Sequence, residues 1–253
     1  MTDKRSIYVS ITSMQQRQSE LVVTLNSIIN QTMKPDCIFL YLSEEPYMLD
    51  AGFKDKIITN KQLNTLLEST PLIEVIWTDN TGPYRKLLPL LKDNFDNDCL
   101  IITIDDDTQY NSTLVETYVN LFDAHQCQIG ARATLMDLKN ARAMKYGGKP
   151  YYNVSAISNF NTGKGGILYH PSFFHKFSEV VFDDIIYNEL CFTNDDIWFN
   201  CLRMNSNIPC YVPKYNYMNR DLHSRYSLWD KFNSIDNQNC KYFIDTMTYL
   251  MAI

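Results

Sequence analysis

The sequence lacks any long apolar run. No segment approaches the ~20 consecutive apolar residues of a membrane-spanning helix. The charged start MTDKR is followed by no apolar stretch of the length found in secretory signals. We therefore expect no membrane span and no export signal.

Basic charge and paired cysteines are also scarce. Lysine and arginine total 23 against 29 acidic residues, which gives a net charge of −6. This balance argues against a nucleic-acid binder, because phosphate backbones are bound by basic patches. The seven cysteines form no CxxC pair. Their odd number and scatter favour reduced thiols in a cytoplasmic protein over a disulfide framework or a zinc site.

What the chain has is the make-up of one α/β domain: 253 residues, of which 45% are hydrophobic and 21% charged. Short apolar runs typical of strands alternate along the chain with stretches whose apolar residues have helical spacing. This order predicts strand–helix–strand units with parallel crossovers. The expected strands are 7–12, 36–42, 72–78, 99–104, 128–134 and 208–213, with a further strand after Gly166. The expected helices are 19–30, 61–69, 112–125 and 228–251, with further helices starting near Pro83 and after Asn194. No repeat or linker interrupts the chain, so we expect halves 1–110 and 111–253 to form one unit.

The most informative stretch is 99–107, CLIITIDDD, in which a strand-like run ends in three carboxylates. Strand alternation would place Asp105 and Asp107 on one face and Asp106 on the other. Two neighbouring carboxylates repel each other unless a cation lies between them. Mg²⁺ or Mn²⁺, shared with substrate phosphates, suits such oxygen ligands. The alternative is a solvated acidic turn, but ligands bind at strand carboxyl ends in α/β sheets.

A strand followed by Asp-x-Asp resembles the metal and nucleotide-diphosphate motif of GT-A-fold glycosyltransferases. The resemblance implies a mostly parallel central sheet flanked by helices, with Asp105 and Asp107 as metal ligands and Asp106 near the donor. It further implies that 1–110 binds the nucleotide-sugar donor, with UDP as the expected nucleotide, and that 111–253 binds the acceptor.

Two segments of the first half extend the resemblance. The end of the first strand resembles the family's opening, which implies that Thr12 and Arg17 line the nucleotide pocket. The segment DNTGPYRKL resembles an Asp-x-Gly-Pro-x-x-Lys-Leu element of bacterial and viral members. On that basis Asp79 would contact the base or ribose, and Lys86 would contact the nucleotide or hold Asp105. A solvated Arg17 and a surface Lys86 are the alternatives.

Three segments of the second half complete the set. In NTGKGGILY, Gly165 and Gly166 resemble the glycines under the donor sugar, although a hairpin turn explains them equally well. In NRDLHSRY, His223 resembles a third metal ligand and Arg225 a residue that clamps the leaving diphosphate; both are assigned by position only.

The second acidic cluster is NDDIWFNCL, where Asn194 is expected to cap a helix. The two aspartates would favour the positive helix end. The resemblance implies that one of them is the catalytic base, with Asp196 preferred over Asp195.

Together these features predict a Mn²⁺- or Mg²⁺-dependent glycosyltransferase that moves a sugar to a glycan or other hydroxyl acceptor, with inversion; a retaining enzyme, which would not need the base, is the mechanistic alternative. One alternative is a non-catalytic glycan- or nucleotide-sugar-binding protein of the same fold. Another is a sugar-1-phosphate nucleotidyltransferase, which the absence of glycine from IYVSITSMQQRQ disfavours, because such enzymes use a glycine-rich phosphate loop there.

Overall fold

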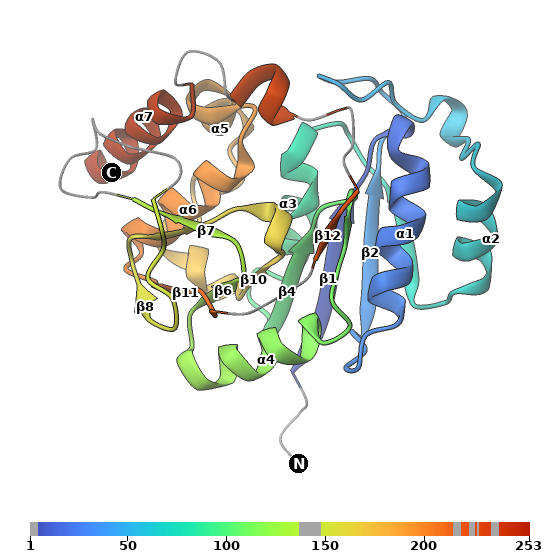
Figure 1. Ribbon diagram of the computed structural model, residues 1–253. Coiled ribbons are helices and arrows are strands. Elements are labelled where there is room, and N and C mark those ends of the chain that lie inside the picture. Colours follow the sequence, from blue (N-terminus) through green and yellow to red (C-terminus); the bar gives the residue numbers. More distant parts are fainter. Residues whose placement is uncertain (1–4, 137–147, 215–218, 223–225, 227, 234–237) are drawn as a thin grey trace.

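The computed structural model describes residues 5–136, 148–214, 219–222, 226, 228–233 and 238–253. Its centre is an eight-stranded sheet with helices on both faces (Figure 1), in the strand order β3-β2-β1-β4-β10-β6-β11-β8. This mixed, mostly parallel α/β architecture confirms the expected fold class.

The first half consists of parallel strands joined by helices. The strands are β1 (Ser6–Thr12), β2 (Cys37–Leu42), β3 (Ile73–Trp77) and β4 (Cys99–Ile104), and the helices between them are α1 (Gln18–Ile29), α2 (Lys61–Ser69) and α3 (Leu88–Asp93). All three connections cross between parallel strands, as the alternating pattern predicted. The carboxyl ends of β1 and β4 therefore meet at one edge of the sheet.

The second half adds short strands of mixed direction. The sheet strands are β6 (Gln128–Gly130), β8 (Ser155–Ala156), β10 (Ile167–Tyr169) and β11 (Cys210–Tyr211). β10 runs antiparallel to both of its neighbours, β4 and β6. Two small sheets pair β5 (Thr108–Gln109) with β12 (Arg220–Asp221), and β7 (Ala133–Leu135) with β9 (Asn159–Asn161). The helices are α4 (Leu114–His125), α5 (Asp184–Cys191), α6 (Asp195–Asn205) and α7 (Gln238–Ala252).

Several sequence expectations differ from these bounds. The run 128–134 is two strands in two sheets rather than one, because the chain leaves the central sheet after Gly130. The helix expected at 112–125 begins at Leu114, and Asn111 accepts a hydrogen bond from the backbone N–H of Thr113. The expected terminal helix consists of a π-helical turn, Trp229–Asn233, and α7, with 234–237 outside the described residues. Helix α5 was not predicted.

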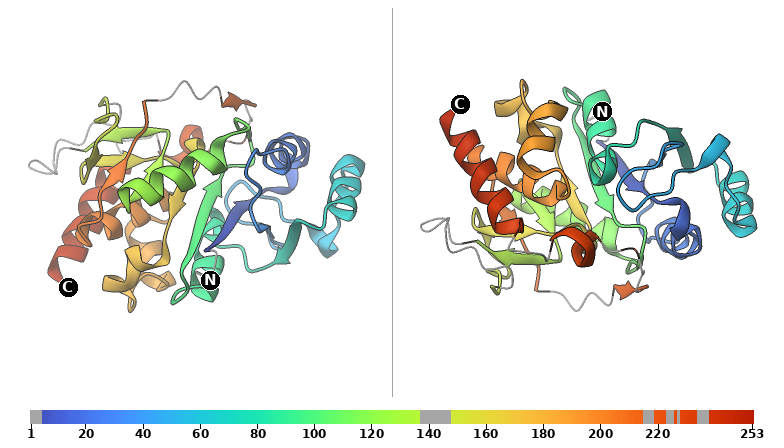
Figure 2. Two further views of the ribbon diagram at one scale, coloured as in Figure 1. Left: turned by 90° about the horizontal axis from the view of Figure 1, so that it is seen from below. Right: turned by 90° about the horizontal axis from the view of Figure 1, so that it is seen from above.

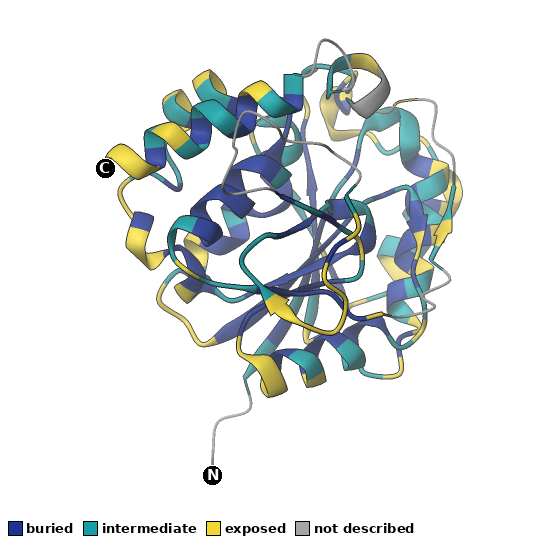
Figure 3. Cartoon of the chain, turned by 60° about the vertical axis from the view of Figure 1, so that its left-hand side comes forward, coloured by how far each residue is buried: buried dark blue, intermediate teal, exposed yellow. Residues whose placement is uncertain are grey.

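Helices α1 and α4 cover one face of the sheet, and α3 covers the other (Figure 2). Consequently all six residues of β4 are buried, and the outer faces of the helices carry the exposed residues (Figure 3). Leu21, Leu25 and Ile28 form the buried face of α1, as their spacing predicted.

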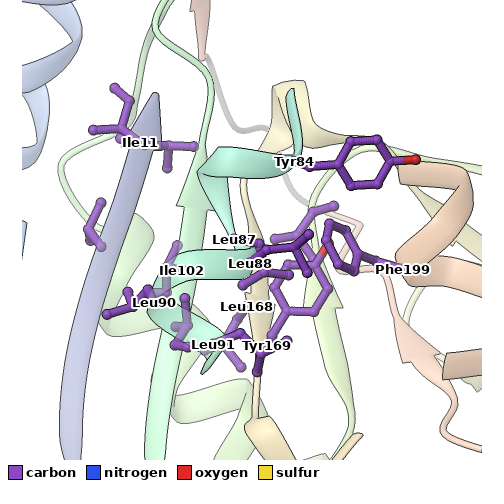
Figure 4. Packing of buried hydrophobic residues seen from close by; sticks show 14 of the residues in the cluster. Ile11, Tyr84, Leu87, Leu88, Leu90, Leu91, Ile102, Leu168, Tyr169 and Phe199 are labelled. Atoms are coloured by element: carbon purple, nitrogen blue, oxygen red, sulfur yellow. The ribbon is translucent and has the colours of Figure 1, made fainter. Parts of the chain in front are cut away.

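The core around α3 includes the 3-10 turn Gly82–Lys86 (Figure 4). Its Tyr84 is buried, lies 6.1 Å from the ring of Phe199 in α6, and donates a hydrogen bond to the carbonyl of Cys191 at 2.7 Å. Leu87 and Leu91 continue this packing into the strands. The turn is thereby held between β1, where the Ser10 hydroxyl donates to the carbonyl of Lys86, and the helices α5 and α6.

No helix in the described part of the chain is long and apolar enough to cross a membrane. All seven cysteines are free thiols, as their number and spacing predicted.

Candidate functional site

A cavity of about 580 Å³ opens at the sheet edge where β1 and β4 end. Its walls include the loop after β1, the loop 47–50, the turn Gly82–Lys86, the acidic triplet, the turn Gly163–Gly165 and the start of α6, together with C-terminal residues such as Asn233 and Asn239. The turn Gly163–Gly165 reaches this edge because β10, which follows it, runs antiparallel to β4, with Ile167 opposite Thr103. The start of α6 lies beside this turn, where the N–H of Gly163 donates to Asp196.

The buried member of the acidic triplet is Asp106. It accepts hydrogen bonds at 2.6 Å from both the Ser13 hydroxyl and the Arg17 guanidinium. The same guanidinium group lies 3.4 Å from a carboxylate oxygen of Asp107. Burial opposes the charge of Arg17, but the carboxylates of Asp106 and Asp107 outweigh it and raise the pKa of Arg17. Arg17 therefore lies in the site rather than in solvent.

The pKa values of the other two aspartates shift in opposite directions. Burial opposes ionisation of Asp105, yet the Lys86 ammonium at 2.9 Å lowers its pKa. For Asp107, burial and then the charges of Asp105 and Asp106 raise the pKa to about 6. The triplet thus carries more negative charge than its protein partners neutralise.

Lys86 connects the two acidic clusters. Its Nζ lies 2.9 Å from Asp105 and 3.4 Å from Asp195, and the side chain is buried. Burial opposes the charge of Lys86, but Asp105, Asp195 and Asp196 together hold its pKa well above the usual range. The expectation that Lys86 holds Asp105 agrees with this contact, and the alternative of a surface lysine does not.

The second acidic cluster lies at the first turn of α6. Asn194 caps the helix, as predicted, by accepting a hydrogen bond from the N–H of Ile197 at 3.1 Å. Both carboxylate oxygens of Asp196 accept from the N–H of Gly163, at 3.0 and 3.1 Å. Burial, reinforced by the charge of Asp195, raises the pKa of Asp196 to about 7.

The glycine that lines the cavity is not one of the two, Gly165 and Gly166, that were expected under the donor sugar. Gly163, not Gly165 or Gly166, faces the cavity: a Cβ there would lie 2.8 Å from Lys86 Nζ and 3.0 Å from Asp105 Oδ1. At Gly165 a Cβ would lie 2.6 Å from the backbone nitrogen of Arg132. Gly166 has a φ of +76°. Both therefore shape the turn, and neither lines the cavity.

The remaining predicted residues divide into three groups. Thr12 lines the cavity, where its hydroxyl donates to the carbonyl of Tyr41 at 2.9 Å and accepts from Arg85. Asp79 is exposed and does not line the cavity, because the side chain that enters the wall is that of the next residue, Asn80. His223 and Arg225 lie outside the described residues.

Sequence reasoning missed two ion pairs in the wall. Arg85 Nη2 lies 2.7 Å from a carboxylate oxygen of Asp50, and both residues are buried. Lys164 Nζ lies 2.5 Å from Asp221 in β12. Arg85 and Lys164 are sequence neighbours of the predicted site residues Lys86 and Gly165. Their acidic partners are too distant in the sequence for any local pattern to identify them.

Comparisons with known proteins bear on the fold. Neither a protein-family model nor a curated protein matches the sequence. Among solved structures, TarS of S. aureus in complex with UDP matches with a TM-score of 0.52 and 12% identity, over 84% of this chain and 59% of that one. A second TarS structure, in complex with UDP-GlcNAc, has a TM-score of 0.52 and 12% identity, over 92% and 66%. The fold is GT-A-like.

A third structure broadens that likeness. A 4-diphosphocytidyl-2C-methyl-D-erythritol synthase from Anaerococcus prevotii matches with a TM-score of 0.53 and 14% identity, over 98% of this chain and 96% of that one. In contrast, this chain spans about three-fifths of the UDP-bound TarS fragment. These likenesses establish the architecture of the domain.

The donor groups at the acidic triplet fit a hard divalent cation. Two carboxylates, those of Asp105 and Asp107, line the cavity with negative charge that Lys86 and Arg17 only partly neutralise. Within the described ranges no three Asp, Glu, His or Cys side chains converge in a metal-binding cluster. Two carboxylates suit Mg²⁺ or Mn²⁺, because proteins hold these ions by one or two carboxylates together with water and substrate phosphates.

Proposed function

We propose that the chain is a metal-dependent glycosyltransferase that moves a sugar from a nucleotide-sugar, with UDP as its nucleotide, to a hydroxyl acceptor. The observation that carries the proposal is the Lys86 ammonium, which lies within 3.4 Å of carboxylates from both acidic clusters at one cavity. Inverting glycosyl transfer needs both groups together: positive charge at a leaving diphosphate, and a base at the incoming hydroxyl. The likeness to TarS, a glycosyltransferase that binds UDP and UDP-GlcNAc, supports the same assignment.

In this proposal Asp105 and Asp107 hold the metal ion. Mn²⁺ or Mg²⁺ bound there would neutralise the developing charge on the nucleoside diphosphate. Arg17 and Lys86 supply further positive charge beside the triplet.

Asp196 is the proposed base. As the acceptor oxygen forms its bond to the anomeric carbon, the carbon–oxygen bond to the diphosphate breaks, and the electron pair leaves with the nucleoside diphosphate. The acceptor proton passes to Asp196, which Gly163 holds in place through both carboxylate oxygens. A single displacement of this kind inverts the anomeric configuration. A base with a pKa near the working pH is efficient, and that of Asp196 is about 7.

The test is a thermal-shift titration with nucleoside diphosphates and nucleotide-sugars, with and without Mn²⁺, on wild type and Asp107→Ala. At a hundredfold excess over Kd, a ligand that binds only the folded state stabilises it by roughly 2.7 kcal/mol, which is several degrees for a chain of this size. We expect a Mn²⁺-dependent shift with one nucleotide that Asp107→Ala abolishes. A complete absence of shift would reject the proposal. The product's anomeric configuration, read by NMR, tests inversion separately.

Nucleotidyl transfer is a second candidate, because the match to the diphosphocytidyl-methylerythritol synthase covers nearly all of both chains. The loop that follows β1 argues against it, since 12–17 contains no glycine to wrap a triphosphate. Release of pyrophosphate from CTP or UTP in the presence of sugar phosphates would favour this candidate over the first.

A further inference from the structure

One end of the cavity differs in chemistry from the acidic triplet. Where α6 and α7 begin, the wall consists of four uncharged polar residues, which we call the amide subsite: Thr193, Asn194, Asn233 and Asn239. None is basic, and the subsite continues directly into Asp195 and Asp196.

The amide subsite is built by hydrogen bonds between segments distant in sequence. Asn194 uses both ends of its side chain: its oxygen caps α6, and its Nδ2 donates to Asn239 Oδ1 at 2.9 Å. The Thr193 hydroxyl donates to Asn233 Oδ1 at 2.7 Å. The contact with Asn194 orients the amide of Asn239 and leaves its Nδ2 as the remaining donor.

That donor has no partner among the residues that the structure describes, although Asn239 is only 3% exposed. A buried polar group without a partner costs about 1–3 kcal/mol. Because Asn239 is one of the residues that line the cavity, a donor kept at this cost indicates a ligand atom that accepts a hydrogen bond. Hydroxyl oxygens of a sugar are suitable acceptors, and their protons can be donated onward to carboxylates.

Charge decides between neutral and anionic ligands at this end. A phosphate or carboxylate group bound beside Asn239 would lie close to the acidic pair that follows Asn194, and like charges repel. The wall lysine that contacts Asp195, Lys86, is already paired with Asp105 and Asp195. An uncharged polyhydroxyl molecule is not repelled by the two aspartates and needs no cation to bind it.

Resting on the proposed function, we propose that the amide subsite binds the acceptor, and that this acceptor is an uncharged carbohydrate. One of its hydroxyl oxygens accepts a hydrogen bond from Asn239 Nδ2. A neighbouring hydroxyl then lies at the Asp196 end of the cavity, where it attacks the donor.

The test uses the whole protein on an array of neutral and anionic glycans, the latter phosphorylated, sulfated or carboxylated, with UDP and Mn²⁺ present. Asn239→Asp is the informative variant, because it keeps an oxygen that accepts from Asn194 and replaces the Nδ2 donor with a carboxylate oxygen, which accepts but does not donate when ionised. Asn239→Leu removes both, and Asn26→Asp, on the exposed face of α1, is the matched control. UDP binding to each variant is measured by calorimetry in parallel, which also reports whether the site is folded.

We expect neutral glycans to bind wild type and the control, and Asn239→Asp to bind them about tenfold more weakly with UDP affinity unchanged. Preference for anionic glycans, equal binding by Asn239→Asp, or no glycan binding would each overturn the inference, while UDP binding kept the proposed function intact. Neutral glycan binding lost in Asn239→Asp, without any UDP binding, would support the subsite and reject the transferase.

Discussion

Replacing Asp196 with asparagine should stabilise the protein at neutral and alkaline pH. In the folded state the pKa of Asp196 is about 7 because of burial and the nearby charge of Asp195, against 3.8 for a free side chain. The folded protein therefore holds this proton more tightly than the unfolded chain does. Protonation of Asp196 therefore adds to the free energy of unfolding at acid pH, and this contribution is lost as the pH rises from about 4 to about 7.

The size of the effect follows from these two pKa values. Each pH unit between them costs about 1.4 kcal/mol, so ionised Asp196 destabilises the fold by roughly 4 kcal/mol above pH 7. A negative charge at a helix N-terminus contributes about 0.3–1 kcal/mol in the opposite direction. Because the proton is shared in part with Asp195, we expect a net gain of about 2–3 kcal/mol in Asp196→Asn.

Urea unfolding of both proteins at pH 4, 6 and 8 measures this gain. The difference should be near zero at pH 4 and greatest at pH 8, while Asp96→Asn, at an exposed position, should show no such trend. If Asp196→Asn were no more stable than wild type at pH 8, the electrostatic argument would be refuted. The protonation of Asp196 also governs activity, because a base must be ionised to accept a proton. Wild-type turnover should rise as the pH increases through about 7, and Asp196→Asn should be inactive at every pH.

Three further changes test the supporting structure. Lys86→Met leaves two carboxylates unpaired and should cost about 3–5 kcal/mol at pH 7 in urea unfolding; the loss should shrink at pH 5, where these carboxylates take up protons. Gly165→Ala forces a Cβ against the backbone of Arg132 and should cost about 1–3 kcal/mol, measured by thermal unfolding. Tyr118→Phe removes the hydroxyl that accepts from the N–H of Ala131 and donates to the carbonyl of Gly165, both at 2.8 Å; about 1–3 kcal/mol of stability should be lost, and amide exchange at Ala131 should accelerate.

Much of the first half could be predicted because its signals are local. The helix Lys61–Ser69 has the expected bounds, with Asn60 as its cap, and β4 ends where its apolar run meets Asp105. Asn194 was likewise identified as a cap from its place before two aspartates. Periodicity and capping are read over a few residues, so one sequence contains them in full.

The second half was predicted less well because its strands are short and their partners are distant. Nothing in 128–134 indicates that the chain changes sheets after Gly130, and β7 is completed only by its pairing with β9. A three-residue strand has too little pattern to specify its neighbour or its direction.

The sequence by itself determined the two acidic clusters, the helices and strands that carry them, and the glycine-rich turn. Only the tertiary structure decided that these meet at one cavity: the antiparallel pairing of β10 with β4 places the glycine-rich turn there, and the N–H of Gly163 then binds Asp196. It also decided that Gly163 rather than Gly165 contacts the carboxylates, and that Lys86 joins Asp105 to Asp195. The reason is physical: hydrogen bonding along a helix acts between near neighbours, whereas strand pairing and burial of charge depend on residues that the chain brings together only on folding.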